Sequence, residues 1–150
     1  MKNPALVLEG ANAAIRSLIS TVFSSGVPKS TLDLVGLRTG QMNNCELCIG
    51  QSLGSAEPGE AARARLDSVA TWRAASCFSE SERAALELCE AATTLANRYD
   101  SVPDALWREL KRHYDEKPLA GLVLFVAAMN MFTRVNVCTR QTQPEWVQAA

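Results

Sequence analysis

Apolar residues recur with helical spacing along the first part of the chain. Between Pro4 and Phe23 they fall on one face of a helix with a 3.6-residue period. Gly26 and Pro28 follow directly and are typical helix-ending residues. The pattern therefore predicts one helix over residues 4–23. The same pattern predicts a helix over residues 30–42 and another over residues 60–71. Between them, a helix is predicted to begin at the cysteines at 45–48, with Asn43 or Asn44 as its N-cap.

The second half of the chain carries clearer signals for helix starts. Ser79 and Glu82 have the spacing of a capping box, in which each side chain accepts a hydrogen bond from the other residue's backbone amide. The segment 101–104 predicts a second capping box, and residues 117–137 predict a long last helix. No window alternates as a β-strand would. The sequence therefore predicts an all-α fold, a compact bundle of about six or seven helices.

The composition is that of one globular domain covering residues 1–150. Hydrophobic residues make up 47% and charged residues 21%, which excludes wholesale disorder. A formal net charge of −1 without a local cluster of Lys and Arg argues against a nucleic-acid partner. The most apolar stretch, residues 119–129, is too short to span a bilayer, so no membrane partner is expected. The N-terminal residues do not form an export signal, and we expect a cytoplasmic protein.

The candidate chemistry centres on Cys45 and Cys48. Two thiols three positions apart at a helix start are close enough to form a disulfide. The helix N-terminus stabilises a thiolate, which is the nucleophilic form of cysteine. A zinc site would require two further ligands, and the other three cysteines and the single histidine are isolated. Redox chemistry is the favoured interpretation, and a metal site or two structural cysteines that happen to be close remain the alternatives.

The segment Leu37–Ile49, which contains both cysteines, resembles the signature of the carboxymuconolactone decarboxylase family, specifically its alkyl hydroperoxidase D-like branch. Three later segments resemble the same pattern in the same order: Trp72-Arg73 with 78–86, 102–104, and 130–134. The resemblance implies an all-helical domain that forms homo-oligomers, commonly trimers or hexamers. It also implies a thiol-based peroxidase or disulfide reductase without a bound cofactor or metal.

In that branch a Glu and a His help to deprotonate the reactive thiol. The matching positions here are Asp33, twelve residues before Cys45, and Ser52, four residues after Cys48. Asp33 can still accept a proton, whereas a Ser hydroxyl is not a base near neutral pH. The expected activity is therefore reduction of hydroperoxides by the dithiol, attenuated at Ser52. An external dithiol, of which a lipoyl-bearing protein is one form, would supply the electrons.

Either thiol of the pair could attack the hydroperoxide. The helix dipole favours Cys45, and the relay implied by the resemblance favours Cys48, with Cys45 resolving the sulfenic acid. We follow the relay. The alternatives are a non-catalytic redox sensor or binding module on the same fold, or a decarboxylase-type enzyme. The decarboxylase would require a general acid or base in the pocket.

The other reactive, aromatic and charged side chains considered are expected to have structural roles. We expect the other cysteines to be small apolar core residues, His113 to be structural or solvated, and the aromatic residues to lie in the core or at subunit contacts. We expect Asn130 and Arg134 to form a hydrogen-bond network and the acidic residues of 80–90 to lie on a solvated face. The other cysteines are Cys77, Cys89 and Cys138, the aromatic residues are Trp72, Trp107 and Phe132, and the acidic residues are Glu80, Glu82, Glu87 and Glu90.

Overall fold

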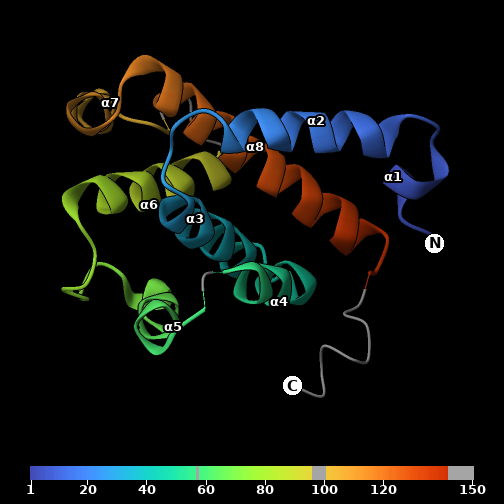
Figure 1. The fold of residues 1–150 in the computed structure, drawn as a ribbon, viewed down its shortest axis with the longest axis horizontal. Helices are drawn as coiled ribbons and strands as arrows, with labels where there is room; N and C mark the ends of the chain where they lie inside the picture. The colour runs from blue at the N-terminus through green and yellow to red at the C-terminus, as the bar shows by residue number, and fades with distance from the viewer. Residues whose placement is uncertain (57, 96–100, 142–150) are drawn as a thin grey trace.

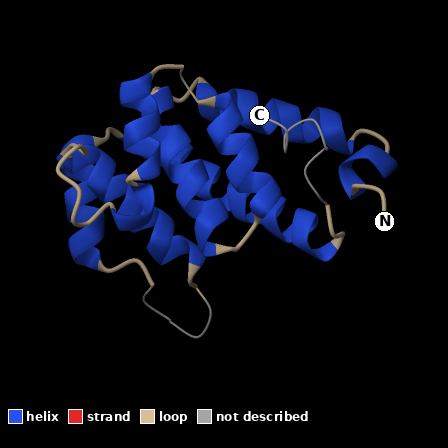
Figure 2. Ribbon diagram, turned by 90° about the horizontal axis from the view of Figure 1, so that it is seen from below, coloured by secondary structure: helices blue, strands red, loops and turns tan. Residues whose placement is uncertain are grey.

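The computed structural model describes residues 1–56, 58–95 and 101–141, and these residues form helices joined by loops. The all-α prediction is confirmed, and Figure 2 shows helices and loops alone within the described part. The elements are α1 (Pro4–Val7), α2 (Ala11–Phe23), α3 (Lys29–Met42), α4 (Glu46–Ser55), α5 (Glu60–Asp67), a 3₁₀ turn (Val69–Thr71), α6 (Glu80–Thr93), α7 (Asp104–His113) and α8 (Glu116–Cys138).

The predicted helix over residues 4–23 is divided into two. Leu8 is extended after α1, and Gly10 has a φ of +77°, a conformation that side-chain-bearing residues rarely adopt. Leu6 and Val7 are exposed and not on a core face. The segment 60–71 likewise divides into α5 and the 3₁₀ turn. The described residues therefore form eight α-helices, one of them a single turn, where six or seven were predicted.

The predicted capping box at the start of α6 is confirmed. The amide of Glu82 donates to Ser79 Oγ at 3.2 Å, and the amide of Ser79 donates to Glu82 Oε2 at 2.9 Å. The second predicted box is wrong, because α7 begins after Pro103 without a side-chain cap. The fixed φ of proline brings the chain into that helix without such a cap.

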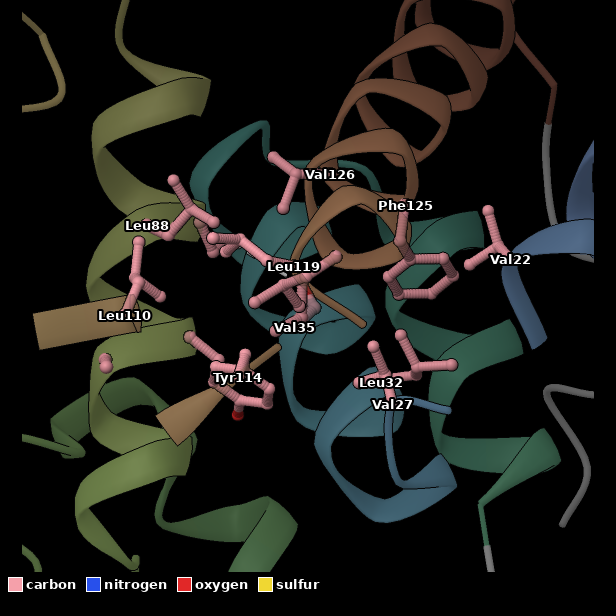
Figure 3. Close-up of a cluster of buried hydrophobic side chains, with 14 of the residues drawn as sticks. Val22, Val27, Leu32, Val35, Leu88, Leu110, Tyr114, Leu119, Phe125 and Val126 are labelled. Atoms are coloured by element: carbon pink, nitrogen blue, oxygen red, sulfur yellow. Dashed lines mark hydrogen bonds between the residues drawn. The ribbon is translucent and has the colours of Figure 1, made fainter. Parts of the chain in front are cut away.

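Helix α3 lies at the centre of the fold and packs against α4, α6 and α8 (Figure 1). Figure 3 shows Leu32 and Val35 of α3 among Leu88, Phe125 and Val126 of the two long neighbouring helices. Each of these side chains is nearly inaccessible to solvent. Burying apolar side chains of this size stabilises the fold by about 1.5–3 kcal/mol each. The core therefore holds α3 rigidly, and α3 carries Asp33.

Two acidic residues of α6 are not on a solvated face, contrary to the prediction. Glu82 is buried in the capping box, with 8% exposure. Glu90 accepts a hydrogen bond from Trp72 Nε1 at 2.9 Å and forms ion pairs with Arg38 and Arg73 at 2.7 and 2.6 Å. Burial raises the pKa of Glu90, but the hydrogen bonds from these three residues outweigh it, so the pKa lies below its usual value. The other two acidic residues of the set are exposed.

Asn130 connects three helices, as the predicted network requires. Its Oδ1 accepts hydrogen bonds from Asn43 Nδ2 at 3.2 Å and Arg134 Nη1 at 2.9 Å. Its Nδ2 donates to Thr93 Oγ1 at 3.0 Å. The end of α3 is thereby fixed to α6 and α8 directly before the cysteine segment.

Helix α8 is the one described helix that is long and apolar enough to cross a membrane by length and composition. The apolar window is longer than the predicted stretch 119–129, and 44% of it is buried inside the domain. A core helix of a globular protein meets the same criterion. Leu119, Leu122 and Phe125 are buried here in the main core.

Candidate active site

Cys45 and Cys48 lie at the start of α4, where they form a disulfide with their Cα atoms 5.2 Å apart. Both residues are buried, with 3% and 2% exposure. Cys45 itself is the N-cap, so the predicted Asn cap is wrong. Asn43 instead ends α3 and donates to Thr39 O, and Asn44 takes a left-handed φ of 50° that turns the chain into α4. The packed end of α3 therefore positions the pair.

Each sulfur atom accepts one hydrogen bond. The amide of Cys48 donates to Cys45 Sγ at 3.3 Å, the contact of an N-cap. Asn136 on α8 donates from Nδ2 to Cys48 Sγ at 3.5 Å and is itself buried. Donors of this kind stabilise a thiolate after the disulfide is reduced. Sequence reasoning missed Asn136, because its position in the last helix gives no sign that it reaches α4.

The structure brings Cys48, Asp33 and Ser52 to one cavity of about 390 Å³, which we call the apolar pocket. Of the four site residues that the resemblance implies, these three line the cavity and Cys45 does not. The pocket is lined by Ile19, Phe23, Leu32, Asp33, Gly36, Cys48, Gln51, Ser52, Ser55, Phe125, Met129 and Phe132. Apart from Phe132, its hydrophobic lining residues were not singled out in the sequence. Phe23 and Met129 come from α2 and α8, and periodicity does not indicate which helices converge on α4.

Asp33 is engaged in an ion pair at the pocket. Its Oδ2 lies 2.6 Å from Lys29 Nζ one helical turn earlier, and its side chain is 12% exposed. Lys29 Nζ also donates to the carbonyl of Ser55 at 2.9 Å. The lysine therefore connects α3 to the end of α4 and neutralises much of the charge that Asp33 brings to the pocket.

Ser52 is buried at 8% exposure in the same wall as Cys48. Gly36 of α3 faces it: a Cβ atom at position 36 would lie 3.4 Å from Ser52 Oγ. Helix α3 therefore lies close to Ser52 at this glycine. Because a hydroxyl does not act as a base near neutral pH, the pocket offers Asp33 as its carboxylate and Ser52 as a hydrogen-bonding group.

Cys45 faces a second, smaller concavity of about 190 Å³, which we call the polar groove. The groove lies between the start of α4 and the end of α8. Its lining residues are Asn44, Cys45, Glu46, Leu47, Asn136, Val137, Arg140 and Gln141. Most of them have polar or charged side chains, unlike those of the apolar pocket. The two cysteines therefore line different cavities.

The other three cysteines differ in environment. Cys89 is fully buried beside Thr39, and burial raises the pKa of its thiol to about 11. It is the inert core residue that the sequence predicted. Cys77 and Cys138 are exposed, so the prediction of core thiols is wrong for them. Their sequence neighbourhoods gave no sign of the exposure, because an isolated cysteine fits either environment.

His113 belongs to a separate cluster at the end of α7. Its Nε2 lies 2.8 Å from Glu109 Oε1, and ligand atoms of Glu80, Glu109 and His113 all lie within 4.8 Å of one another. Exposed acidic groups commonly gather in this way without a metal. None of the three residues lines the apolar pocket or the polar groove. His113 therefore contributes nothing to the cysteine site.

The sequence model of the carboxymuconolactone decarboxylase family matches residues 9–91, more than half of the chain and the whole of the cysteine segment. The chain belongs to this family. The Bacillus subtilis (strain 168) protein YdfG, which is uncharacterized, is 31% identical over 113 residues, 75% of this chain and 76% of YdfG. The uncharacterized Escherichia coli (strain K12) protein YnjA is 34% identical over 103 residues, 69% of this chain and 55% of YnjA.

Solved structures of this family fold are similar over nearly the whole chain. Agrobacterium tumefaciens ATU0492 is a protein of unknown function, for which a role as the antioxidant defence protein AhpD has been suggested. It superimposes with a TM-score of 0.83 at 25% identity over 95% of this chain and 96% of its own. The debrominase Bmp8 superimposes with a TM-score of 0.76 at 16% identity over 91% of this chain and 73% of its own, a likeness of fold alone.

Proposed function

We propose that this carboxymuconolactone decarboxylase family member is a thiol–disulfide oxidoreductase that reduces hydroperoxides through Cys45 and Cys48. The observation that carries the proposal is the placement of the pair. The two sulfur atoms are within bonding distance at the start of α4, and Cys48 opens to the pocket that contains Asp33 and Ser52. A dithiol that can close to a disulfide beside a cavity is the arrangement that two-electron reduction of a peroxide requires.

The proposed reaction has two bond-forming steps. The Cys48 thiolate attacks one oxygen of ROOH, the O–O bond breaks, and ROH leaves after taking a proton, so that Cys48 becomes a sulfenic acid. The Cys45 thiolate then attacks Cys48 Sγ, the S–O bond breaks, and the departing hydroxide takes a proton from solvent to leave as water as the disulfide forms. An external dithiol returns two electrons and two protons. A lipoyl-bearing protein remains our proposal for its carrier.

Asp33 and Ser52 form a weakened proton relay in this scheme. Asp33 is already paired with Lys29, and Ser52 lacks a group that accepts a proton near neutral pH. Asn136 partly compensates by donating to Cys48 Sγ, which favours the thiolate without removing the proton. We therefore propose slow turnover. The apolar lining of the pocket favours organic hydroperoxides over hydrogen peroxide.

The experiment that tests this function follows the dithiol directly. The reduced protein is treated with an equimolar amount of cumene hydroperoxide, quenched with acid, and labelled with maleimide, and the intact mass is recorded. Loss of two labels with formation of a Cys45–Cys48 disulfide supports the proposal. Cys48→Ser removes peroxide consumption, whereas Cys77→Ser, at an exposed cysteine outside both cavities, leaves it unchanged. Unchanged consumption in Cys48→Ser would refute the assignment.

A redox sensor is the second candidate, and the hydroxyl at position 52 favours it. A pair that oxidises without rapid turnover would report the redox state instead of removing peroxide. A reduction potential close to that of the cytosolic glutathione pool, together with negligible peroxide turnover, would favour the sensor. Steady turnover with an added dithiol would favour the peroxidase.

Assembly into a trimer or hexamer stays a prediction. Val123 and Leu124 of α8 are 39% and 45% exposed in the single chain. A homo-oligomer that covers these side chains would remove apolar surface from water. Light scattering coupled to gel filtration measures the mass directly, and a monomer at micromolar concentration would contradict the prediction.

A further inference from the structure

The two cysteines of the disulfide line different cavities of the protein. Cys48 lines the apolar pocket and not the polar groove, whereas Cys45 lines the polar groove and not the apolar pocket. A thiolate that opens a disulfide must approach the attacked sulfur, and the second sulfur departs as a thiolate. Access therefore determines which cysteine an incoming thiol attacks.

The two cavities also differ in chemistry. Hydrophobic side chains, among them Phe23, Phe125 and Met129, dominate the lining of the apolar pocket. The polar groove presents the amides of Asn44 and Asn136 and charged side chains of both signs beside Cys45. The polar share of the lining is larger in the groove than in the apolar pocket, so a hydrophilic thiol retains more of its hydrogen bonds in the groove.

We propose that the polar groove is a separate reductant site, at which a hydrophilic dithiol attacks Cys45. The proposal rests on the peroxidase function proposed above, in which the hydroperoxide reaches Cys48 through the apolar pocket. The reductant's thiolate attacks Cys45 Sγ, the Cys45–Cys48 bond breaks, and Cys48 leaves as a thiolate. The reductant's second thiol, as a thiolate, then attacks the reductant's first sulfur in the mixed disulfide. The bond from that sulfur to Cys45 breaks and releases the Cys45 thiolate. The reductant is oxidised to a disulfide, and its two protons pass to the cysteines or solvent.

Hydrogen bonding supports the departure of Cys48 but does not select it alone. Asn136 donates from Nδ2 to Cys48 Sγ and also lines the polar groove. The backbone amide of Cys48 likewise donates a hydrogen bond to Cys45 Sγ. Because each sulfur accepts one hydrogen bond, the difference in access decides the direction of attack. Asn136 stabilises the thiolate that then faces the apolar pocket, ready for the next hydroperoxide.

Filling each cavity separately tests the proposal. Val137→Trp adds bulk to the polar groove from an exposed position, and Gln51→Trp adds it to the rim of the apolar pocket. Glu87→Trp, exposed on α6 and lining neither cavity, is the matched control. Two half-reactions are measured by quenched labelling and mass: oxidation of reduced protein by cumene hydroperoxide, and reduction of diamide-oxidised protein by dithiothreitol.

We expect Val137→Trp to slow reduction about tenfold, which corresponds to ~1.4 kcal/mol in the barrier, and to change oxidation little. Gln51→Trp gives the reverse pattern, and Glu87→Trp changes neither rate. Arg140→Trp fills the groove from a second position if Val137→Trp unfolds, as circular dichroism reports. Reduction that Gln51→Trp slows, or that neither groove variant slows, would overturn the proposal. If peroxide forms no disulfide in the wild type, the proposed function fails, while the diamide-oxidised protein still tests the groove.

Discussion

Ser52→His should convert the weakened relay into an efficient one. Position 52 is one helical turn after Cys48, and both residues line the apolar pocket of about 390 Å³. Because position 52 lines this cavity, an imidazole there can extend into the pocket from the same backbone. With a pKa of about 6.5, that imidazole accepts the thiol proton near neutral pH.

The size of the effect follows from the fraction of reactive thiolate. A cysteine with the ordinary pKa of about 8.5 is roughly 3% thiolate at pH 7, so complete deprotonation raises its rate about 30-fold. A thiol as deeply buried as Cys89, whose pKa is about 11, would gain about 10⁴-fold. General-base catalysis spans about 10²–10⁴-fold in enzymes. We therefore expect peroxide consumption by Ser52→His to rise by about 30-fold or more.

The assay is stopped-flow measurement of peroxide consumption with excess cumene hydroperoxide, repeated between about pH 5 and 9. Ser52→Asn is the matched control, because its amide approximates the imidazole in size and hydrogen bonding but takes no proton. Ser52→His should show a rate that rises with pH through about 6.5, the imidazole pKa, and the control should not. Equal rates in wild type, Ser52→His and Ser52→Asn would refute the mapping of the relay to position 52.

Three further results are expected from the buried groups. At pH 8, iodoacetamide should label exposed Cys77 and leave Cys89 unmodified in the folded protein, because a pKa of about 11 leaves about one thiol in a thousand ionised. Glu90→Gln should lower the free energy of unfolding at pH 7 by about 1–2 kcal/mol. Since the pKa of Glu90 is lowered in the folded state, this loss should shrink in urea melts as pH falls through that pKa and the wild-type carboxylate is protonated. Gly121→Ala should destabilise by about 1–3 kcal/mol in the same melts, because the added methyl would overlap Ser25; an unchanged midpoint would contradict this.

The parts of the fold that sequence predicts well are those decided by local chemistry. The capping box of Ser79 and Glu82 is a short-range device, and it forms as predicted. Helical spacing over 30–42 likewise identifies α3 to within one residue. Spacing alone does not reveal a break that leaves the pattern nearly intact, so the turn at Gly10 divided a predicted single helix.

The candidate site shows the same division between local and distant information. The cysteine spacing and the resemblance place Cys48, Asp33 and Ser52 together because they lie on two helices that are consecutive in the chain. Asn136 is 88 positions from Cys48, and a tertiary contact of that range has no local signal. The charged partners of Glu90 also come from distant segments, so a residue expected on a solvated face is half-buried in an ion-pair network.

Cys48 and Cys45 are proposed here to form one redox unit that hydroperoxide oxidises. The most direct test is peptide mapping by mass spectrometry of reduced wild type after addition of an equimolar amount of cumene hydroperoxide, with and without dimedone to trap sulfenic acid. We expect a Cys45–Cys48 disulfide in wild type and a dimedone adduct on Cys48 in Cys45→Ser. An adduct on Cys45 in Cys48→Ser, with Cys48 unmodified in Cys45→Ser, would contradict it.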